Sequence, residues 1–388
     1  MKVFLKKNIK PRIKNGHPWI YDNEIEKIEG NVENGSIVNV FNHEKYFIGK
    51  GYLNTNSKIR VRLLTRKNES INKDFIKKRI LAAIKRRNTS EKTFRVVFSE
   101  ADNLPGLIVD KFESYIVIDI TTLGMEKLKP YILESLIEIF NPLGIYEKSE
   151  SSSRIKEGLE KISEWVYGRG PELIPFQIND IKFLADTKGQ KTGAFLDQRY
   201  NAMILGNFSK NKICLDCFSY TGNFAVHMLR AGAKNVILID YSKRALEIAD
   251  EIMKLNKFEN YELINANAFD FLKNLDKSSK MFDVISVDPP SFAKSASNKL
   301  SALKGYKEIN LRAMRLLKDG GILATSSCTQ VVSEQEFIST IIAATNDSGK
   351  IARTLYRGGQ PFDHPIVLNI FETNYLKFFL LEIEKIRY

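Results

Sequence analysis

The sequence predicts an α/β protein with a mostly parallel, Rossmann-like sheet in its C-terminal half, preceded by a small β-barrel and an α+β middle domain. After about residue 174, apolar strand candidates alternate with helical stretches, which is typical of βαβ units that carry helices on both faces of a parallel sheet. Before residue 70, short apolar runs are separated by turn signals, which is typical of small barrels. We therefore expect three domains, at residues 1–70, 71–168 and 169–388.

The composition is that of a globular protein. The chain has 388 residues, of which 43% are hydrophobic and 27% are charged. Three cysteines are too few for a disulfide framework, and the N-terminus lacks the apolar stretch of a signal peptide or a membrane span. We therefore expect a cytoplasmic protein with no membrane partner.

Positive charge is concentrated in the N-terminal quarter. Residues 1–95 hold 23 basic and 9 acidic side chains, a net charge of +14, whereas the whole chain carries +13. This concentration of positive charge would attract the phosphates of a nucleic acid. The alternative interpretation is a basic surface that is only solvated. We expect nucleic acid to bind here, with Arg60 and Arg62 among its contacts.

A strand, a turn and a helix at residues 215–224 carry the first ligand motif. The turn contains a single glycine, Gly222, so it lacks the close backbone approach that a dinucleotide pyrophosphate needs. About 18 residues later the next strand candidate ends at Asp240, whose carboxylate suits a ribose diol. This spacing indicates an adenosine-containing ligand without a diphosphate, and S-adenosylmethionine (SAM) is the candidate. The alternative for Asp240 is an N-cap of the following helix.

Two further strand candidates end in groups that suit a reaction at the same edge of the sheet. Asp288, Pro289 and Pro290 follow one strand, and the two proline rings fix a rigid loop that can hold a substrate. Cys328 ends the other strand and is a candidate nucleophile. Cys214 and Cys217 lack the second Cys or His pair of a metal site, so we expect them to pack in the core and expect no metal.

These groups suit methylation of cytosine at carbon 5. That carbon is too weak a nucleophile to take a methyl group from a sulfonium directly. Addition of the Cys328 thiolate to carbon 6 turns the ring into an enamine, and Asp288 would stabilise the ring at N3 and the exocyclic amine. A base then removes the proton from carbon 5 and the thiol is eliminated. The sequence leaves that base unassigned.

Short motifs spread over nearly the whole chain form a specific combination. They lie at residues 16–21, 49–52, 102–110, 191–199, 305–310, 363–365 and 372–377. Together they resemble the bacterial SAM-dependent large-subunit (23S) ribosomal RNA 5-methylcytosine methyltransferases with an N-terminal PUA domain. The resemblance implies a class I methyltransferase fold with a seven-stranded sheet, a PUA-like RNA-binding domain, SAM as cofactor and large-subunit ribosomal RNA as partner. A homodimer is compatible with it.

The resemblance also implies the site. Cys328 would be the nucleophile, Asp288 the group at the methyl-transfer centre and Asp240 the ribose ligand. The cofactor contacts would be Gln198, Arg199, Asp216, Phe218, Ser219, Tyr220, Thr221, Gly222, Asp240, Tyr241, Asn267, Ala268 and Asp288. The substrate contacts would be Pro289, Pro290, Phe292, Lys294, Arg60 and Arg62.

Two positions, Asn267 and Thr329, depart from the family pattern. Asn267 stands where Asp is usual beside the adenine, so its oxygen would accept from the adenine amine without charge. Thr329 follows Cys328 where Ser is frequent, and Ser291 stands where some other RNA cytosine-5 methyltransferases have a second Cys. Two alternatives remain. One is an RNA methyltransferase acting on an exocyclic amine, with Cys328 as a bystander, and the other is a non-catalytic ribosome-assembly factor.

Overall fold

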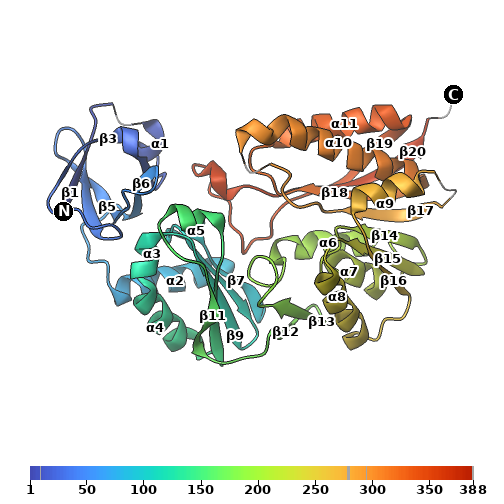
Figure 1. Cartoon of the computed structure of the whole chain (residues 1–388), viewed down its shortest axis with the longest axis horizontal. Helices are drawn as coiled ribbons and strands as arrows, with labels where there is room; N and C mark the ends of the chain where they lie inside the picture. Colours follow the sequence, from blue (N-terminus) through green and yellow to red (C-terminus); the bar gives the residue numbers. More distant parts are fainter. Residues whose placement is uncertain (9, 278–279, 294, 387–388) are drawn as a thin grey trace. The chain divides into compact units, whose positions relative to one another are not determined.

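The computed structural model describes residues 1–8, 10–277, 280–293 and 295–386 (Figure 1). They form two compact units, which we call the first and the second unit. The first unit comprises Met1–Asn179, Leu184–Ala194 and Phe362–Thr373, and the second comprises Asp180–Phe183, Phe195–Pro361 and Asn374–Tyr388. The first two predicted domains thus fall in the first unit, together with residues 169–179, 184–194 and 362–373 of the third.

The first unit begins with a sheet that we call the N-terminal barrel. Its described strands, in spatial order, are β2 (Trp19–Tyr21), β6 (Ile59–Thr65), β5 (Phe47–Leu53), β4 (Ile37–Phe41), β1 (Lys2–Leu5) and β3 (Ile25–Glu29). The short helix α1 (Pro11–Lys14) follows β1. Gly51 allows β5 and β6 to approach, because a Cβ there would lie 2.1 Å from the carbonyl oxygen of Arg62.

The middle domain of the first unit is a sheet with helices on one face. Its described strands, in spatial order, are β11 (Ile162–Gly168), β10 (Gly144–Ser149), β9 (Tyr115–Ile120), β8 (Leu107–Phe112) and β7 (Thr93–Phe98). Helices α2 (Lys73–Arg87) and α4 (Lys129–Phe140) bury Ile76 and Leu136 against strand residues such as Val109 and Ile118. Shorter helices are α3 (Leu123–Lys127) and α5 (Ser152–Lys156), and β12 (Leu173–Ile178) and β13 (Ile181–Asp186) form a separate hairpin.

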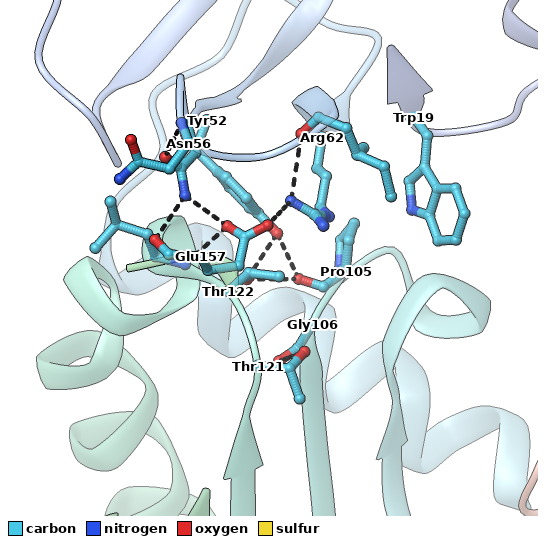
Figure 2. Close-up of polar contacts among 12 residues, drawn as sticks. Trp19, Tyr52, Asn56, Arg62, Pro105, Gly106, Thr121, Thr122 and Glu157 are labelled. Atoms are coloured by element: carbon cyan, nitrogen blue, oxygen red, sulfur yellow. Dashed lines mark hydrogen bonds and ion pairs between the residues drawn. The ribbon is translucent and has the colours of Figure 1, made fainter. Parts of the chain in front are cut away.

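Polar contacts join the N-terminal barrel to the middle domain (Figure 2). Arg62 Nη1 donates to Glu157 Oε1 at 2.8 Å, and the Tyr52 hydroxyl donates to the Pro105 carbonyl at 2.6 Å. The exposed fraction of Arg62 is only 8%. Because its guanidinium is buried in an ion pair, the expected RNA contact of Arg62 is wrong. Arg60 is half-buried and donates to the Thr55 carbonyl of its own barrel.

The C-terminal segment of the first unit is fixed by hydrogen bonds to the barrel and the middle domain. Asp363 Oδ2 accepts from the backbone N–H of Arg95 at 2.9 Å, and His17 Nε2 hydrogen-bonds Glu372 Oε2 at 3.0 Å. The resemblance motifs at 16–21 and at 363–365 and 372–377 therefore include residues that hold this unit together.

The second unit is built on a seven-stranded, mostly parallel sheet. The described strands, in spatial order, are β16 (Tyr261–Asn265), β15 (Asn235–Asp240), β14 (Ile213–Cys217), β17 (Phe282–Val287), β18 (Leu317–Ser327), β20 (Lys377–Lys385) and β19 (Lys350–Gly358). Among these strands β20 runs antiparallel to β18 and β19, and the other described pairs are parallel. The order confirms the predicted Rossmann-like methyltransferase sheet.

Helices cover both faces of this sheet (Figure 1). They are α6 (Arg199–Gly206), α7 (Asn223–Arg230), α8 (Lys243–Leu255), α9 (Ala268–Leu275), α10 (Lys299–Leu316) and α11 (Glu334–Ser348). Leu272, Ile309 and Phe337, from α9, α10 and α11, pack in one core with strand residues such as Ile285 and Leu323. Burial on both faces explains why the central strands are almost continuously apolar. None of the described helices has the length and apolar character that a bilayer crossing needs.

Candidate active site

The turn between β14 and α7 has a constrained backbone. Phe218, Tyr220 and Gly222 have φ angles of 60°, 47° and 84°, in the left-handed region that residues with a Cβ adopt at a cost of roughly 1–2 kcal/mol. A Cβ on Gly222 would also lie 2.9 Å from the Met253 methyl group, so glycine is required there on two grounds. Strained turns of this kind are often found at ligand sites.

Two polar atoms at this turn are available to a ligand. Ser219 Oγ and Asn223 Nδ2 are buried, and neither hydrogen-bonds to any residue in the described part of the chain. Buried polar groups are normally paired, so these two indicate a missing polar partner. A hydroxyl and an amide donor match the carboxylate of an amino-acid group, which SAM has at its methionine end. These residues therefore fit the cofactor.

Asp240 connects the end of β15 to the same turn. Its Oδ2 accepts from Tyr220 N–H at 2.8 Å, and its Oδ1 accepts from Ser242 N–H at 2.8 Å. The N-cap of α8 is Ser242, whose Oγ accepts from Ala245 N–H at 3.2 Å, so the helix-cap alternative for Asp240 is wrong. A carboxylate has about four acceptor positions, so Asp240 retains some for a diol. The adjoining Tyr241 is 83% exposed and presents an aromatic face.

Asp216 has a structural role. Its side chain is fully buried, Oδ2 accepts from Ala225 N–H at 3.1 Å, and Oδ1 accepts from Ser286 Oγ at 2.5 Å. Burial raises the pKa of Asp216 to about 7. The expected direct contact of Asp216 with the cofactor is therefore wrong, because the carboxylate ties β14 to α7 and β17 instead.

Asn267 is the N-cap of α9. Its Oδ1 accepts from Phe269 N–H at 2.9 Å and from Asp270 N–H at 3.4 Å, and Ala268 behind it is buried. Both lone pairs of this oxygen are directed to the helix. In this conformation the oxygen caps the helix, and the contact of Asn267 with the adenine amine stays a prediction.

Asp288 is held at the end of β17 by two side chains. Gln198 Nε2 donates to Asp288 Oδ1 at 2.8 Å, and Ser326 Oγ donates to the same oxygen. Gln198 is oriented in turn by Asn201, whose Nδ2 donates to its Oε1 at 2.7 Å. Arg199 is buried beside them, with its guanidinium 4.8 Å from the centre of the Tyr200 ring. The segment expected to enclose the cofactor thus also orients the carboxylate at the expected reaction centre.

The proline loop is anchored by an aromatic cluster. Pro289 is buried and Pro290 is exposed. Phe292 is half-buried, and its ring centre lies 4.7 Å from that of Tyr306, 5.7 Å from that of Phe269 and 6.5 Å from that of Phe218. Phe292 therefore packs mainly against the protein. Lys294, the other expected substrate contact of this loop, lies outside the described residues.

Cys328 follows β18 and is the half-buried thiol of the chain. Cys214 and Cys217 are both fully buried, and burial raises the pKa of Cys214 to about 12, which makes it a poor nucleophile at neutral pH. The three cysteines therefore separate, by exposure, into two core residues and one candidate nucleophile.

Ser291 and Thr329, which flank the expected reaction centre, contact each other. Ser291 Oγ lies 3.1 Å from Thr329 Oγ1, and the Tyr306 hydroxyl lies 2.7 Å from the same Thr329 oxygen. Ser291 belongs to the loop of Asp288, and Thr329 follows Cys328 directly. This hydroxyl contact therefore brings together the loops that carry the expected nucleophile and the expected carboxylate.

Several residues of this site were not predicted as such from the sequence. Ser326 and Asn201 orient Asp288 and Gln198, and Asn223 supplies a buried donor at the turn. Ser326 stands two residues before Cys328 at a strand end, which was a usable signal. Asn201 and Asn223 lie on helices, and the sequence pattern around them gives no such signal.

Two regions of the chain match described families. Residues 3–66 match the family described as PUA-like domain, and residues 208–360 match the family described as methyltransferase domain. SMU.776, described as a methyltransferase and complexed with SAH, has a TM-score of 0.85 at 22% identity, covering 98% of this chain and 100% of that chain. A protein from Streptococcus mutans described as a SAM-dependent methyltransferase has a TM-score of 0.84 at 22% identity, with the same coverage. At this identity the likeness concerns the fold.

Full-length relatives are more similar in sequence. The ribosomal RNA large subunit methyltransferase I of Aliivibrio fischeri is 34% identical over 391 residues, which cover 98% of this chain and 99% of that protein. The protein of the same name from Pseudoalteromonas atlantica is 36% identical over 370 residues, which cover 93% and 94%. The chain belongs to the ribosomal RNA large subunit methyltransferase I family.

Proposed function

We propose that this protein methylates carbon 5 of a cytosine in large-subunit ribosomal RNA, with SAM as methyl donor and Cys328 as covalent nucleophile. The observation that carries the proposal is the contact between Ser291 and Thr329, which joins the loops of Asp288 and Cys328 at one edge of the sheet. Membership of a family named for ribosomal RNA methylation supports the substrate class and, through it, the proposed cytoplasmic location.

The chain's own residues hold the cofactor. Bound SAM supplies an electrophilic methyl group. Ser219 and Asn223 provide unpaired buried polar atoms at the methionine end, Asp240 provides acceptors for the ribose diol, and Tyr241 provides an exposed ring for the adenine. The fixed turn at residues 218–222 keeps these groups in place before binding, which lowers the entropic cost of association.

Cys328 and Asp288 act on the base. The Cys328 sulfur forms a bond to carbon 6, and the electrons of the 5,6 double bond make carbon 5 nucleophilic. Gln198 and Ser326 fix the Asp288 carboxyl group, which stabilises the ring at N3 and the exocyclic amine. After methylation, a base removes the proton from carbon 5, the electrons of that C–H bond restore the 5,6 double bond, and the Cys328 sulfur leaves as the thiolate.

Exposed lysines of the N-terminal barrel provide the RNA contact in this proposal. They are Lys6, Lys7, Lys10 and Lys14, and none of them has an ion-pair partner among the described residues. Other cations of the same quarter are engaged within the protein. Arg66 donates to the carbonyls of Ile13 and His17, and Lys73 and Lys77 pair with Glu138. The proposal places the RNA contact on α1 and the segment before it, where these four exposed lysines lie close together in the chain.

A homodimer is the remaining part of the proposal. In the described part of the sheet, β19 is an edge strand, and an unpaired edge is a surface on which a second copy can dock. Light scattering on the purified protein tests this. A mass of one chain at all concentrations would reject it.

The covalent mechanism is tested by trapping. RNA that contains 5-fluorocytidine has no removable proton at carbon 5, so we expect a complex between enzyme and RNA that survives denaturation. Cys328→Ala should abolish the complex and methylation, whereas Cys214→Ala and Cys217→Ala should retain both. Formation of 5-methylcytosine by Cys328→Ala would reject the mechanism, whereas transfer of the methyl group to an exocyclic amine by this variant would favour the amine-methylating alternative.

A further inference from the structure

Lys377 lies beside the loop that carries Cys328. It is the first residue of β20 and pairs in the sheet with Ser327, the residue before Cys328. Its side chain is 8% exposed, and its Nζ donates to the carbonyls of Thr329 at 2.6 Å and of Val332 at 3.0 Å. The ammonium group is therefore buried within the backbone loop that starts at the proposed nucleophile.

This ammonium has no carboxylate partner within ion-pair distance among the described residues. Burial of an uncompensated charge is costly, and a protein usually avoids it by pairing or by loss of the proton. Burial lowers the pKa of Lys377 to about 8, whereas Cys328 and Glu334 act in the opposite direction. That value is still above neutral pH, so the group is mostly charged there. Two of its three N–H donors are used by carbonyls, which leaves one.

We propose that Lys377 is a positioning residue that stabilises the thiolate form of Cys328. Its buried positive charge would lower the free energy of the thiolate that attacks the base, because a low local dielectric strengthens the attraction. A role of Lys377 in catalysis rests on the proposed function. Its effect on the acidity of the Cys328 thiol is independent of that function.

Among the described residues, the other titratable groups around this loop are neutral, acidic or, like Arg357, already paired with an acid. Tyr306 on α10 has a pKa that burial raises, so it is neutral, and its hydroxyl bonds Thr329. Asp288, after β17, and Glu334, at the start of α11, are acidic, and Glu334 pairs with Arg357 of β19. Acidic neighbours disfavour a second anion, so a compensating cation matters more here.

A purely structural role is the alternative, because the same hydrogen bonds fix residues 329–332. Lys350 provides a matched control for it. Its Nζ donates to the carbonyls of Met314 at 2.5 Å and Leu317 at 2.7 Å, and burial lowers its pKa to about 8 as well. Lys350 lies at the start of β19 and contacts the end of α10 and the first residue of β18, not the Cys328 loop.

The test is the pH dependence of Cys328 alkylation by iodoacetamide, followed on the Cys328 peptide by mass spectrometry. Lys377→Met should shift the midpoint upward by about one pH unit, which means roughly tenfold slower alkylation well below the midpoint. Lys377→Arg should restore most of the rate, and Lys350→Met should behave like the wild type. An unchanged midpoint in folded Lys377→Met overturns the proposal.

The wild-type protein gives an independent check if Lys377→Met does not fold. Its midpoint should lie below the ordinary thiol value of about 8.5, and a value at or above it overturns the proposal. A low midpoint without 5-fluorocytidine trapping would reject the covalent mechanism and leave the thiolate assignment intact, so the two failures are distinguishable.

Discussion

Arg62 and Glu157 form an ion pair of 2.8 Å in which the arginine side chain is 9% exposed and the glutamate side chain 4%. Asn54 Nδ2 also donates to Glu157 Oε2 at 2.8 Å, so the carboxylate is surrounded by donors from the barrel. A residue that the charge pattern assigned to RNA thus connects two parts of the protein (Figure 2).

Arg62→Met should destabilise the protein by about 3–5 kcal/mol, because it leaves Glu157 buried without its cation. Urea denaturation measures the change, and Arg62→Met with Glu157→Gln should recover part of the loss. The salt dependence of RNA binding by the folded variant should be unchanged. A fall in that slope would restore Arg62 as a phosphate contact.

Replacement of Lys6, Lys7, Lys10 and Lys14 by glutamine should weaken RNA binding without unfolding the protein. If each lysine releases one counterion, the slope of log K against log salt should fall by roughly 3, as expected for four contacts to single-stranded RNA. Fluorescence anisotropy at several salt concentrations measures the slope. Lys73→Gln with Lys77→Gln is the control, since both lysines are paired with Glu138. An equal fall of the slope in the control would contradict specific RNA binding at the surface of Lys6, Lys7, Lys10 and Lys14.

Asp240→Ala should cost about 1.5–3 kcal/mol of SAM binding free energy, because charge-assisted hydrogen bonds to the ribose diol are lost. Calorimetric titration of the folded variant measures this. Ser242→Ala is the matched control, since it removes the cap of α8 and should cost about 1 kcal/mol of stability while affinity stays nearly constant. Equal losses of SAM affinity in both variants would mean that binding depends on the local fold and not on the Asp240 carboxylate.

Asp216→Asn should make unfolding less dependent on pH. The pKa of Asp216 in the folded protein is about 7, above its ordinary value of 3.8, so the folded state binds the proton more tightly. Its contribution to stability is therefore full below pH 3.8 and is lost as pH rises through 7. The wild type should lose on the order of 1–3 kcal/mol relative to Asp216→Asn between pH 4 and 8. Parallel stability curves for the two proteins would contradict this, and calorimetry should show retained SAM binding if Asp216 is structural.

The sequence by itself determined the fold class and the edge of the sheet that carries the site. Alternating apolar strands and helices indicate βαβ units, and the carboxyl ends of parallel strands meet at one edge. For that reason Asp240, Asp288 and Cys328, which are far apart in the chain, could be assigned to one site from local patterns. The turn at Gly222 was identified in the same way, since a left-handed residue after a strand is encoded locally.

Only the tertiary structure decided which polar side chains are available to ligands. Arg62 and Glu157 are 95 residues apart, and Ser291 and Thr329 are 38 apart, so no local period encodes their contacts. Asp216 and Asn267 occupy motif positions, but one is buried by α7 and β17 and the other caps α9. Lys377 is one of 59 Lys and Arg residues in the sequence. Its proposed role depends on the position that β20 gives it beside the Cys328 loop. The availability of a charge depends on what packs against it, and packing is decided by contacts between distant segments of the chain.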